Sequence, residues 1–130
     1  MNWLRIILAA LSFMIVGALW YSPLVLGDVW AELGGMDMNA LQPTPWHYLG
    51  AASVALVMSI GMAQLFQWVR PASLVHAWKV VAVVWLAFVV TTQFSGVIWG
   101  GYPLKIFLID IGCVLVNVLV MAPILYQRKR

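Results

Sequence analysis

Charged residues are scarce in this sequence: Lys, Arg, Asp and Glu together make up 8% of its 130 residues. A soluble domain carries about a quarter charged residues, so the composition excludes an ordinary soluble globular protein. The chain has a single Cys, which excludes a disulfide framework within the chain and any metal or redox motif built from several cysteines. Intrinsic disorder is excluded as well, because it requires low hydrophobicity and high charge.

Long apolar runs dominate what is present. Hydrophobic residues make up 65% of the chain, and its mean hydropathy is +0.99. A helix needs about 20 apolar residues to cross the hydrocarbon core of a membrane, and four runs reach that length: residues 3–26, 46–69, 76–99 and 104–126. These runs and their connections use nearly the whole chain. We therefore predict an all-α fold, with one integral membrane domain over residues 1–130 built as a four-transmembrane-helix bundle.

Basic residues predict the orientation of this bundle. Four spans place both termini and the loop between the second and third spans on one side. That side carries most of the basic residues: Arg5, Arg70, Lys79, Arg128, Lys129 and Arg130. Cytoplasmic loops are enriched in Lys and Arg, so we expect both termini in the cytoplasm and loop 27–45 outside, in a bacterial inner membrane. We interpret the basic tail as a topology anchor that contacts anionic lipid, and we expect no nucleic-acid partner.

Small residues in two spans predict helix–helix contacts. Close approach of helices in lipid depends on such residues, and they recur here at four-residue spacing: Ala51, Ala55, Ser59 and Ala63 in the second span, Gly96 and Gly100 in the third. The spacing leaves open whether these contacts lie within the chain or between copies in a homo-oligomer, and a contact within the chain is the simpler interpretation. Trp20 and Trp85 lie deeper than the interfacial aromatic residues, so we expect them to pack against other helices.

The connection between the first and second spans has features of its own. Pro23 is expected to kink or end the first helix. Residues 28–33 have weak helical character and precede Gly34-Gly35, which predicts a short interfacial helix followed by a turn. Loop 27–45 then either covers the outer end of the bundle or lies on the bilayer.

Asp110 is the one acidic residue inside a predicted span, and such residues are functional candidates because they are costly in lipid. It lies about 9 Å below the outer end of the fourth span, at about 1.5 Å per residue, and Gln93 reaches the same depth in the third. Tyr21 and Ser22 lie about 6–8 Å below the outer end of the first span. Asn117 is two turns after Asp110 on the same face. The candidate polar cluster is therefore Trp20, Tyr21, Ser22, Gln93, Asp110 and Asn117.

This cluster has two interpretations that the residues leave open. It is either an outward-facing site that binds a small ligand, lipid or ion, or an interhelical hydrogen-bonded clamp that holds the bundle together. Tyr21, Thr92, Gln93 and the indole N–H of Trp20 are the expected hydrogen-bond partners of Asp110.

Three functional hypotheses follow, and none of them is an enzyme. The first is a ligand-binding membrane protein, the second an accessory subunit of a larger membrane complex, and the third a small proton-coupled exporter. His47 and His76 begin spans at opposite membrane faces, so they cannot share one metal ion or haem. We therefore expect neither a metal nor a cofactor.

Two segments resemble a known family. The first is Trp20-Tyr21-Ser22-Pro23, preceded by Gly17, and the second is Ile109-Asp110-Ile111-Gly112. Together they resemble the bacterial four-helix membrane family known as domain of unknown function 1761, over the whole chain. Cys113 stands where the family usually has Tyr, and Pro123 where it usually has a Gly-Ala pair. The resemblance implies the same fold and topology, leaves the function open, and suggests that the two motifs form one site or one structural unit.

Overall fold

The computed structural model describes residues 1–37 and 42–128, and these residues form helices and no strand. In chain order the elements are α1 (Trp3–Trp20), α2 (Gly27–Leu33), α3 (Pro45–Val69), α4 (Leu74–Val84), η1 (Trp85–Val90), α5 (Thr91–Gly100) and α6 (Leu104–Leu125). Elements α4, η1 and α5 are continuous, and η1 is a π-helical segment within them.

Four of these helices are long and apolar enough to cross a membrane: α1, α3, the continuous helix Leu74–Gly100 and α6. The predicted all-helical fold with four spans is confirmed, and the chain is a membrane protein. The second, third and fourth helices begin and end within two residues of the expected ranges. The short helix α2 lies where the sequence predicted one, directly before the turn at Gly34-Gly35.

The first helix is shorter than expected, because α1 ends at Trp20 and not near residue 26. Pro23 explains this end, since a residue that precedes proline is disfavoured in helical conformation and Ser22 is in that position. The chain instead forms a compact turn. In it the amide of Leu26 donates to the carbonyl of Trp20 at 3.1 Å, and the amide of Gly27 donates to the carbonyl of Ser22 at 2.9 Å.

Both histidines stabilise the starts of helices. The amide of Thr44 donates to Nδ1 of His47 at 3.0 Å, which forms a capping box at the start of α3. The amide of Ala72 donates to Nδ1 of His76 at 3.1 Å, beside the N-cap residue of α4, Ser73. These bonds pair backbone N–H groups at helix starts that have no partner within the helix.

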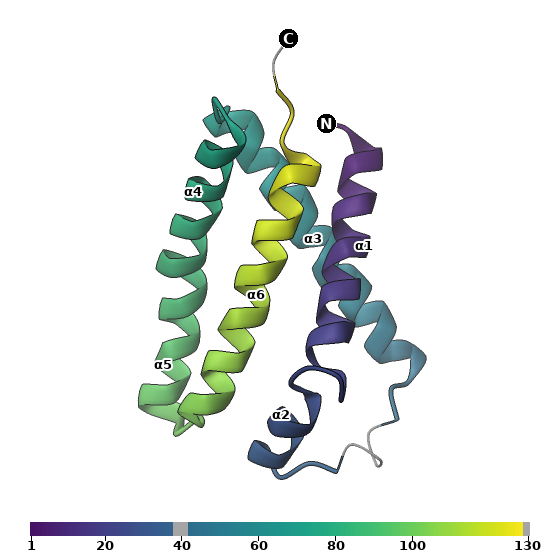
Figure 1. Ribbon diagram of the computed structural model, residues 1–130, viewed down its shortest axis with the longest axis vertical. Helices are drawn as coiled ribbons and strands as arrows, with labels where there is room; N and C mark the ends of the chain where they lie inside the picture. The colour runs from purple at the N-terminus through teal and green to yellow at the C-terminus, as the bar shows by residue number, and fades with distance from the viewer. Residues whose placement is uncertain (38–41, 129–130) are drawn as a thin grey trace.

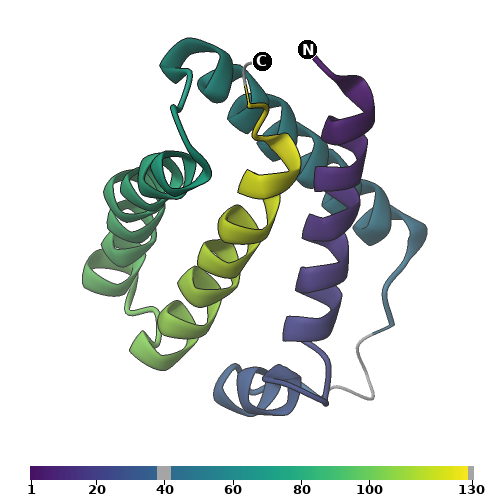
Figure 2. The ribbon, with the colours of Figure 1, turned by 45° about the horizontal axis from the view of Figure 1, so that its top comes forward.

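Helix α6 lies at the centre of the bundle (Figure 1), and it contacts every other helix. It lies between α1 on one side and the continuous α4–α5 helix on the other in both ribbon views (Figures 1 and 2), while α3 crosses α1 obliquely. The chain termini and the α3–α4 connection lie at one end, and α2 and the α5–α6 connection at the other. We call these the termini end and the α2 end.

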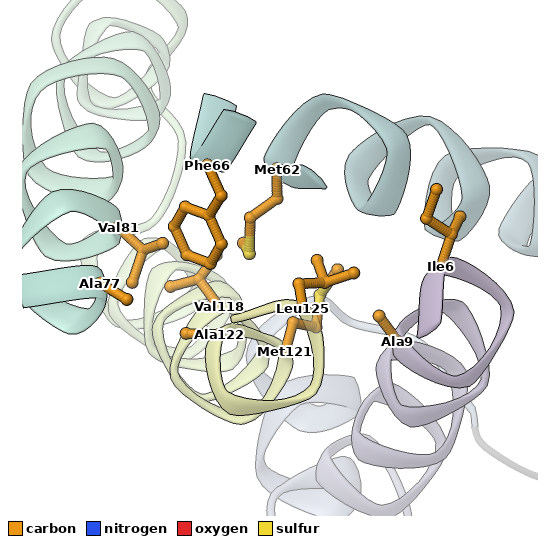
Figure 3. Close-up of a cluster of buried hydrophobic side chains, with 10 residues drawn as sticks. All are labelled: Ile6, Ala9, Met62, Phe66, Ala77, Val81, Val118, Met121, Ala122 and Leu125. Atoms are coloured by element: carbon orange, nitrogen blue, oxygen red, sulfur yellow. The ribbon is translucent and has the colours of Figure 1, made fainter. Parts of the chain in front are cut away.

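The apolar core lies toward the termini end and draws on four helices (Figure 3). Its side chains converge on α6: Ile6, Ala9, Met62, Phe66, Ala77, Val81, Val118, Met121, Ala122 and Leu125. The small-residue ridge of α3 contributes to this packing within the chain. Ala55 and Ser59 are fully buried and Ala63 packs against the core, whereas Ala51 is exposed.

The Gly96–Gly100 pair does not form a contact within the described part of the chain, contrary to the simpler expectation. Both glycines are exposed, and no atom of the described residues lies within 4 Å of where a Cβ would be, apart from their own helical surroundings. Helix α5 has no buried residue at all. These glycines therefore face outward, toward lipid or another protein.

Three tryptophans connect other helices to backbone carbonyls of α6. The indole N–H of Trp20 donates to Ile109 at 3.0 Å, that of Trp85 to Ile111 at 2.8 Å, and that of Trp78 to Leu119 at 3.0 Å. The expectation that Trp20 and Trp85 pack against other helices is confirmed. Trp78 has a further role, because Pro123 has no N–H to donate to the carbonyl four residues before it, which is that of Leu119. The indole of Trp78 takes its place.

Candidate functional site

Asp110 lies in the second turn of α6, and two tyrosines bond to its carboxyl group. The hydroxyl of Tyr21 donates to Oδ1 at 2.6 Å, and the hydroxyl of Tyr102 donates to Oδ2 at 3.1 Å. Tyr21 follows α1 directly and Tyr102 lies in the short connection before α6. Among the described residues Asp110 has no ion-pair partner, so these hydroxyls are its polar contacts within the protein.

Tyr21 is held in place by the turn between α1 and α2. Its amide donates to the carbonyl of Gly17 at 3.1 Å. Gly27 closes the turn in a space that admits no side chain, because a Cβ there would lie 2.3 Å from the carbonyl oxygen of Tyr21. Glycine is therefore required at this position by close approach of backbone to backbone.

Trp20 joins the same two segments from the other side. In addition to its bond to the carbonyl of Ile109, its ring lies against Gly112, where a Cβ would come within 3.2 Å of Cζ2. The two sequence motifs therefore meet in space. Trp20 contacts the backbone of the Ile109–Gly112 segment, and Tyr21 contacts the carboxyl group within it.

A cavity of about 420 Å³ lies beside Asp110. Its polar or reactive lining comes from the residue that follows α1 and from α2, α5 and α6: Tyr21, Trp30, Gln93, Asp110, Cys113 and Asn117. Apolar groups complete it, among them Phe13 and Val114. The volume lies within the range of sites that bind small molecules, about 300–1,000 Å³.

Two buried polar atoms at this cavity have no hydrogen-bond partner among the described residues. They are Nε1 of Trp30, a donor, and Oδ1 of Asn117, an acceptor. Asn117 is 1% exposed, and the one side-chain hydrogen bond that it makes to the described residues is from Nδ2 to the sulfur of Cys113 at 3.5 Å. Leaving such a group unpaired costs about 1–3 kcal/mol, and native proteins leave few of them.

Trp30 stands at the α2 end of the cavity and was not predicted to contribute. Its ring meets that of Tyr21 edge to face, with centroids 5.4 Å apart and an interplanar angle of 71°. Helix α2 is part of loop 27–45, and it places the side chain of Trp30 on the wall of the cavity. This position is the one expected if the loop covers the outer end of the bundle. Residues 38–41 of that loop lie outside the described residues.

The remaining predicted residues are placed differently. Ser22 bonds back to the carbonyl of Leu19 at 2.6 Å, and Thr92 bonds to carbonyls of its own helix, those of Phe88 and Val89. Gln93 lines the cavity but is exposed and, among the described residues, makes no hydrogen bond. Of the expected partners of Asp110, only Tyr21 bonds to it.

Tyr102 was not predicted to contribute, because it lies before the fourth span and only residues within or at the ends of the spans were considered for the polar cluster. Tyr102 lies eight residues before Asp110, in the connection between α5 and α6, and its hydroxyl reaches the carboxyl group. Partial burial, together with the charge and the hydrogen bond of Asp110, raises the pKa of Tyr102 above its ordinary value. The signal for this contact is its proximity in sequence to the intramembrane acid.

The polar groups of the site are one carboxyl, two amides, one thiol, two phenols and one indole N–H. Within the part of the chain that the structure describes, no three His, Cys, Asp or Glu residues lie close enough to hold a metal ion together. The arrangement can accept hydrogen bonds through Asp110, and Asn117 and Trp30 each hold one further unpaired polar atom that is enclosed beside the cavity.

No curated protein and no solved structure matches the chain. One family does match it, over residues 4–126, and its description is protein of unknown function (DUF1761). The match spans almost the whole chain and includes both motifs that meet at Asp110. The suspected resemblance is confirmed, and the chain belongs to the DUF1761 family.

Proposed function

We propose that this membrane protein binds a small ligand rich in hydrogen-bond donors, such as a primary ammonium group, in the cavity beside Asp110. The observation that carries the proposal is the unpaired Oδ1 of Asn117, fully buried on the same cavity as the carboxyl of Asp110. Asp110 and Asn117 both line the cavity and both carry acceptor oxygens, which favours a ligand that donates. The role we propose for the site is binding.

The carboxyl group of Asp110 retains capacity for such a ligand. An ionised carboxylate offers about four acceptor positions, and the two tyrosine hydroxyls occupy two of them. The bond from Trp30 can go to an oxygen or other acceptor on the same ligand. The ligand would therefore carry one or more donors and an acceptor, in a volume no larger than about 420 Å³.

Orientation and location belong to the same proposal. The distribution of basic residues supports both termini in the cytoplasm of a bacterial inner membrane. The α2 end, with the Asp110 cavity, then lies on the extracytoplasmic side. The ligand would reach the site from outside the cell or from the outer leaflet.

The test is native mass spectrometry of the full-length protein extracted gently from its own membrane. We expect a bound small mass in the wild type that is lost in Asp110→Asn. Asp28→Asn is the matched control, because it removes an exposed acid of α2 and should leave the bound mass in place. A wild-type protein with no bound mass, or a mass that persists in folded Asp110→Asn, would contradict the proposal.

The outward-facing Gly96 and Gly100 support a second candidate, that of an accessory subunit or homo-oligomer. Small residues on a lipid-facing helix permit close approach of another helix. The same native mass spectra measure the number of copies and the partner proteins in the complex. A second copy or a larger protein at fixed stoichiometry supports it, and a monomer contradicts it.

Proton-coupled export, the third hypothesis, predicts proton-dependent cation flux in proteoliposomes that Asp110→Asn abolishes.

A further inference from the structure

A second cavity, of about 990 Å³, lies at the termini end of the bundle. It is far from Asp110, because Leu125 on its wall is fifteen residues further along α6, about 22 Å at about 1.5 Å per residue. Its walls come from the start of α1, the end of α3 and the end of α6. The proposed ligand site and this cavity share no lining residue.

Among the residues that the structure describes, three arginines line this cavity and no acidic residue does. They are Arg5 on α1, Arg70 at the end of α3 and Arg128 after α6. None of the three has an ion-pair partner among the described residues. Three guanidinium groups gathered without a counter-charge create a positive potential that an anion would lower.

The backbone conformation of Arg70 places one of these side chains at the cavity. Arg70 is the C-cap of α3 and adopts the left-handed conformation with φ 50°. Glycine is the usual residue at a left-handed helix end, and among the described residues Arg70 alone has positive φ without being glycine. Arg70 thus places a charged side chain at a position where the left-handed backbone conformation favours glycine, which has no side chain.

Hydrogen-bonding capacity remains on all three arginines. Arg5 uses Nη1 to donate to the carbonyls of Ile124 and Tyr126, at 3.3 and 2.7 Å. Arg70 makes one long bond from Nε to the carbonyl of Gln67, at 3.4 Å. A guanidinium group has five N–H donors. Its planar fork matches the oxygens of a phosphate group.

The cavity lies at the ends of three candidate spans, α1, α3 and α6, which is where lipid headgroups are expected. Trp3 lines it and is 58% exposed, as expected of an aromatic residue at the membrane interface. Phe66 and Leu125 supply an apolar wall next to the arginines. Basic pockets between transmembrane helices are places where anionic headgroups bind, and the combination of charge, interface and apolar wall fits an amphiphile better than a free ion.

We propose that the cavity at the termini end binds the phosphate of an anionic phospholipid headgroup through Arg5, Arg70 and Arg128. The acyl chains then lie along the exposed apolar surface of the helices that flank it. The occupant is one lipid molecule with net negative charge, held at a defined position.

The experiment is native mass spectrometry of the full-length protein in neutral detergent, titrated with phosphatidylglycerol or with phosphatidylcholine of the same acyl chains. We expect phosphatidylglycerol to bind one-to-one and about tenfold or more tightly than phosphatidylcholine, because only its headgroup has net charge. Equal affinity for the two lipids would overturn the proposal, and this comparison depends on no variant.

The variant Arg70→Gln/Arg128→Gln should lose most of this preference. Both residues are exposed, so their replacement disturbs no packing, and Arg5 is left intact because it also pairs carbonyls of α6. Lys79→Gln/Lys105→Gln is the matched control, since it removes the same charge from two exposed residues outside the cavity. An equal loss of the phosphatidylglycerol preference in the control would show that the lipid responds to the net charge of the protein and not to this cavity, and would overturn the proposed site.

Inorganic phosphate distinguishes the two sources of the anion. We expect it to displace phosphatidylglycerol only at a large excess, because it makes no apolar contact. Displacement at equal concentration would overturn the lipid assignment in favour of a free phosphate anion.

Discussion

The two tyrosines bonded to Asp110 differ in their surroundings, and this difference predicts different contributions to stability. Tyr21 is half-buried and its hydroxyl lies 2.6 Å from Oδ1, whereas Tyr102 is 44% exposed and its hydroxyl lies 3.1 Å from Oδ2. Water can replace the bond of an exposed hydroxyl but not that of an enclosed one. The bond from Tyr21 is therefore the one whose loss leaves a carboxyl oxygen without a partner.

We expect Tyr21→Phe to lower the free energy of unfolding by about 1–2 kcal/mol and Tyr102→Phe by less than about 1 kcal/mol. Phe keeps the ring of Tyr21 against Trp30, so the change isolates the hydroxyl. The measurement is equilibrium unfolding of the purified protein in detergent, followed by tryptophan fluorescence. A larger cost for Tyr102→Phe would contradict the assignment of Tyr21 as the principal partner.

At the scale of an element, the turn between α1 and α2 positions the site. It orients Tyr21 toward Asp110, and α2 then carries Trp30 over the cavity. The turn depends on Gly27, because its Cα lies against the carbonyls of Tyr21 and Ser22. Gly61 offers a contrast within α3, since a Cβ there would meet nothing within 4 Å.

Gly27→Ala should destabilise the protein by about 2 kcal/mol or more, because the added methyl group forces backbone atoms apart. Gly61→Ala should leave stability unchanged or raise it slightly, since Ala is the better helix former. Thermal unfolding in the same detergent compares the two variants. Equal melting temperatures for them would contradict the close approach at Gly27.

On the scale of the whole molecule, the bundle is organised around α6. Indoles from α1, α4 and η1 each donate to a different carbonyl of this helix, and the apolar core converges on its second half (Figure 3). Water is absent from the bilayer core, so each of these backbone groups must be paired within the protein. The bond from Trp78 compensates for the missing N–H of Pro123.

This compensation predicts coupling between Trp78 and Pro123. In the wild type, Trp78→Phe should cost about 1 kcal/mol by leaving the carbonyl of Leu119 unpaired. In a Pro123→Ala background the restored amide can bond that carbonyl, so the same change should cost less. A double-mutant cycle of unfolding free energies measures the difference.

Trp68→Phe is the control for this cycle, because Trp68 is 75% exposed and should contribute little in either background. Identical costs of Trp78→Phe with Pro and with Ala at position 123 would show that the indole does not replace the missing bond.

The depth of a residue in the bundle follows from its position in the sequence, but its contacts do not, and the polar cluster illustrates this difference. Counting residues from the ends of the spans brought Tyr21 and Gln93 to the level of Asp110, and both line its cavity. It did not distinguish them, although only Tyr21 bonds to the carboxyl group. Depth follows from the rise per residue, whereas contact also requires that two helices be rotated toward each other, and rotation depends on packing.

The sequence by itself determined the membrane class, the number of spans, the family and the position of Asp110 within a span, because each depends on local composition or on a short motif. Only the tertiary structure decided which groups meet: Tyr102 and Trp30 at the site, Trp78 with Leu119, and three arginines around one cavity. It also decided that the Gly96–Gly100 pair faces outward. These contacts join residues that are distant along the chain or lie in connections, and they arise from helix rotation and turn geometry, which no single segment encodes.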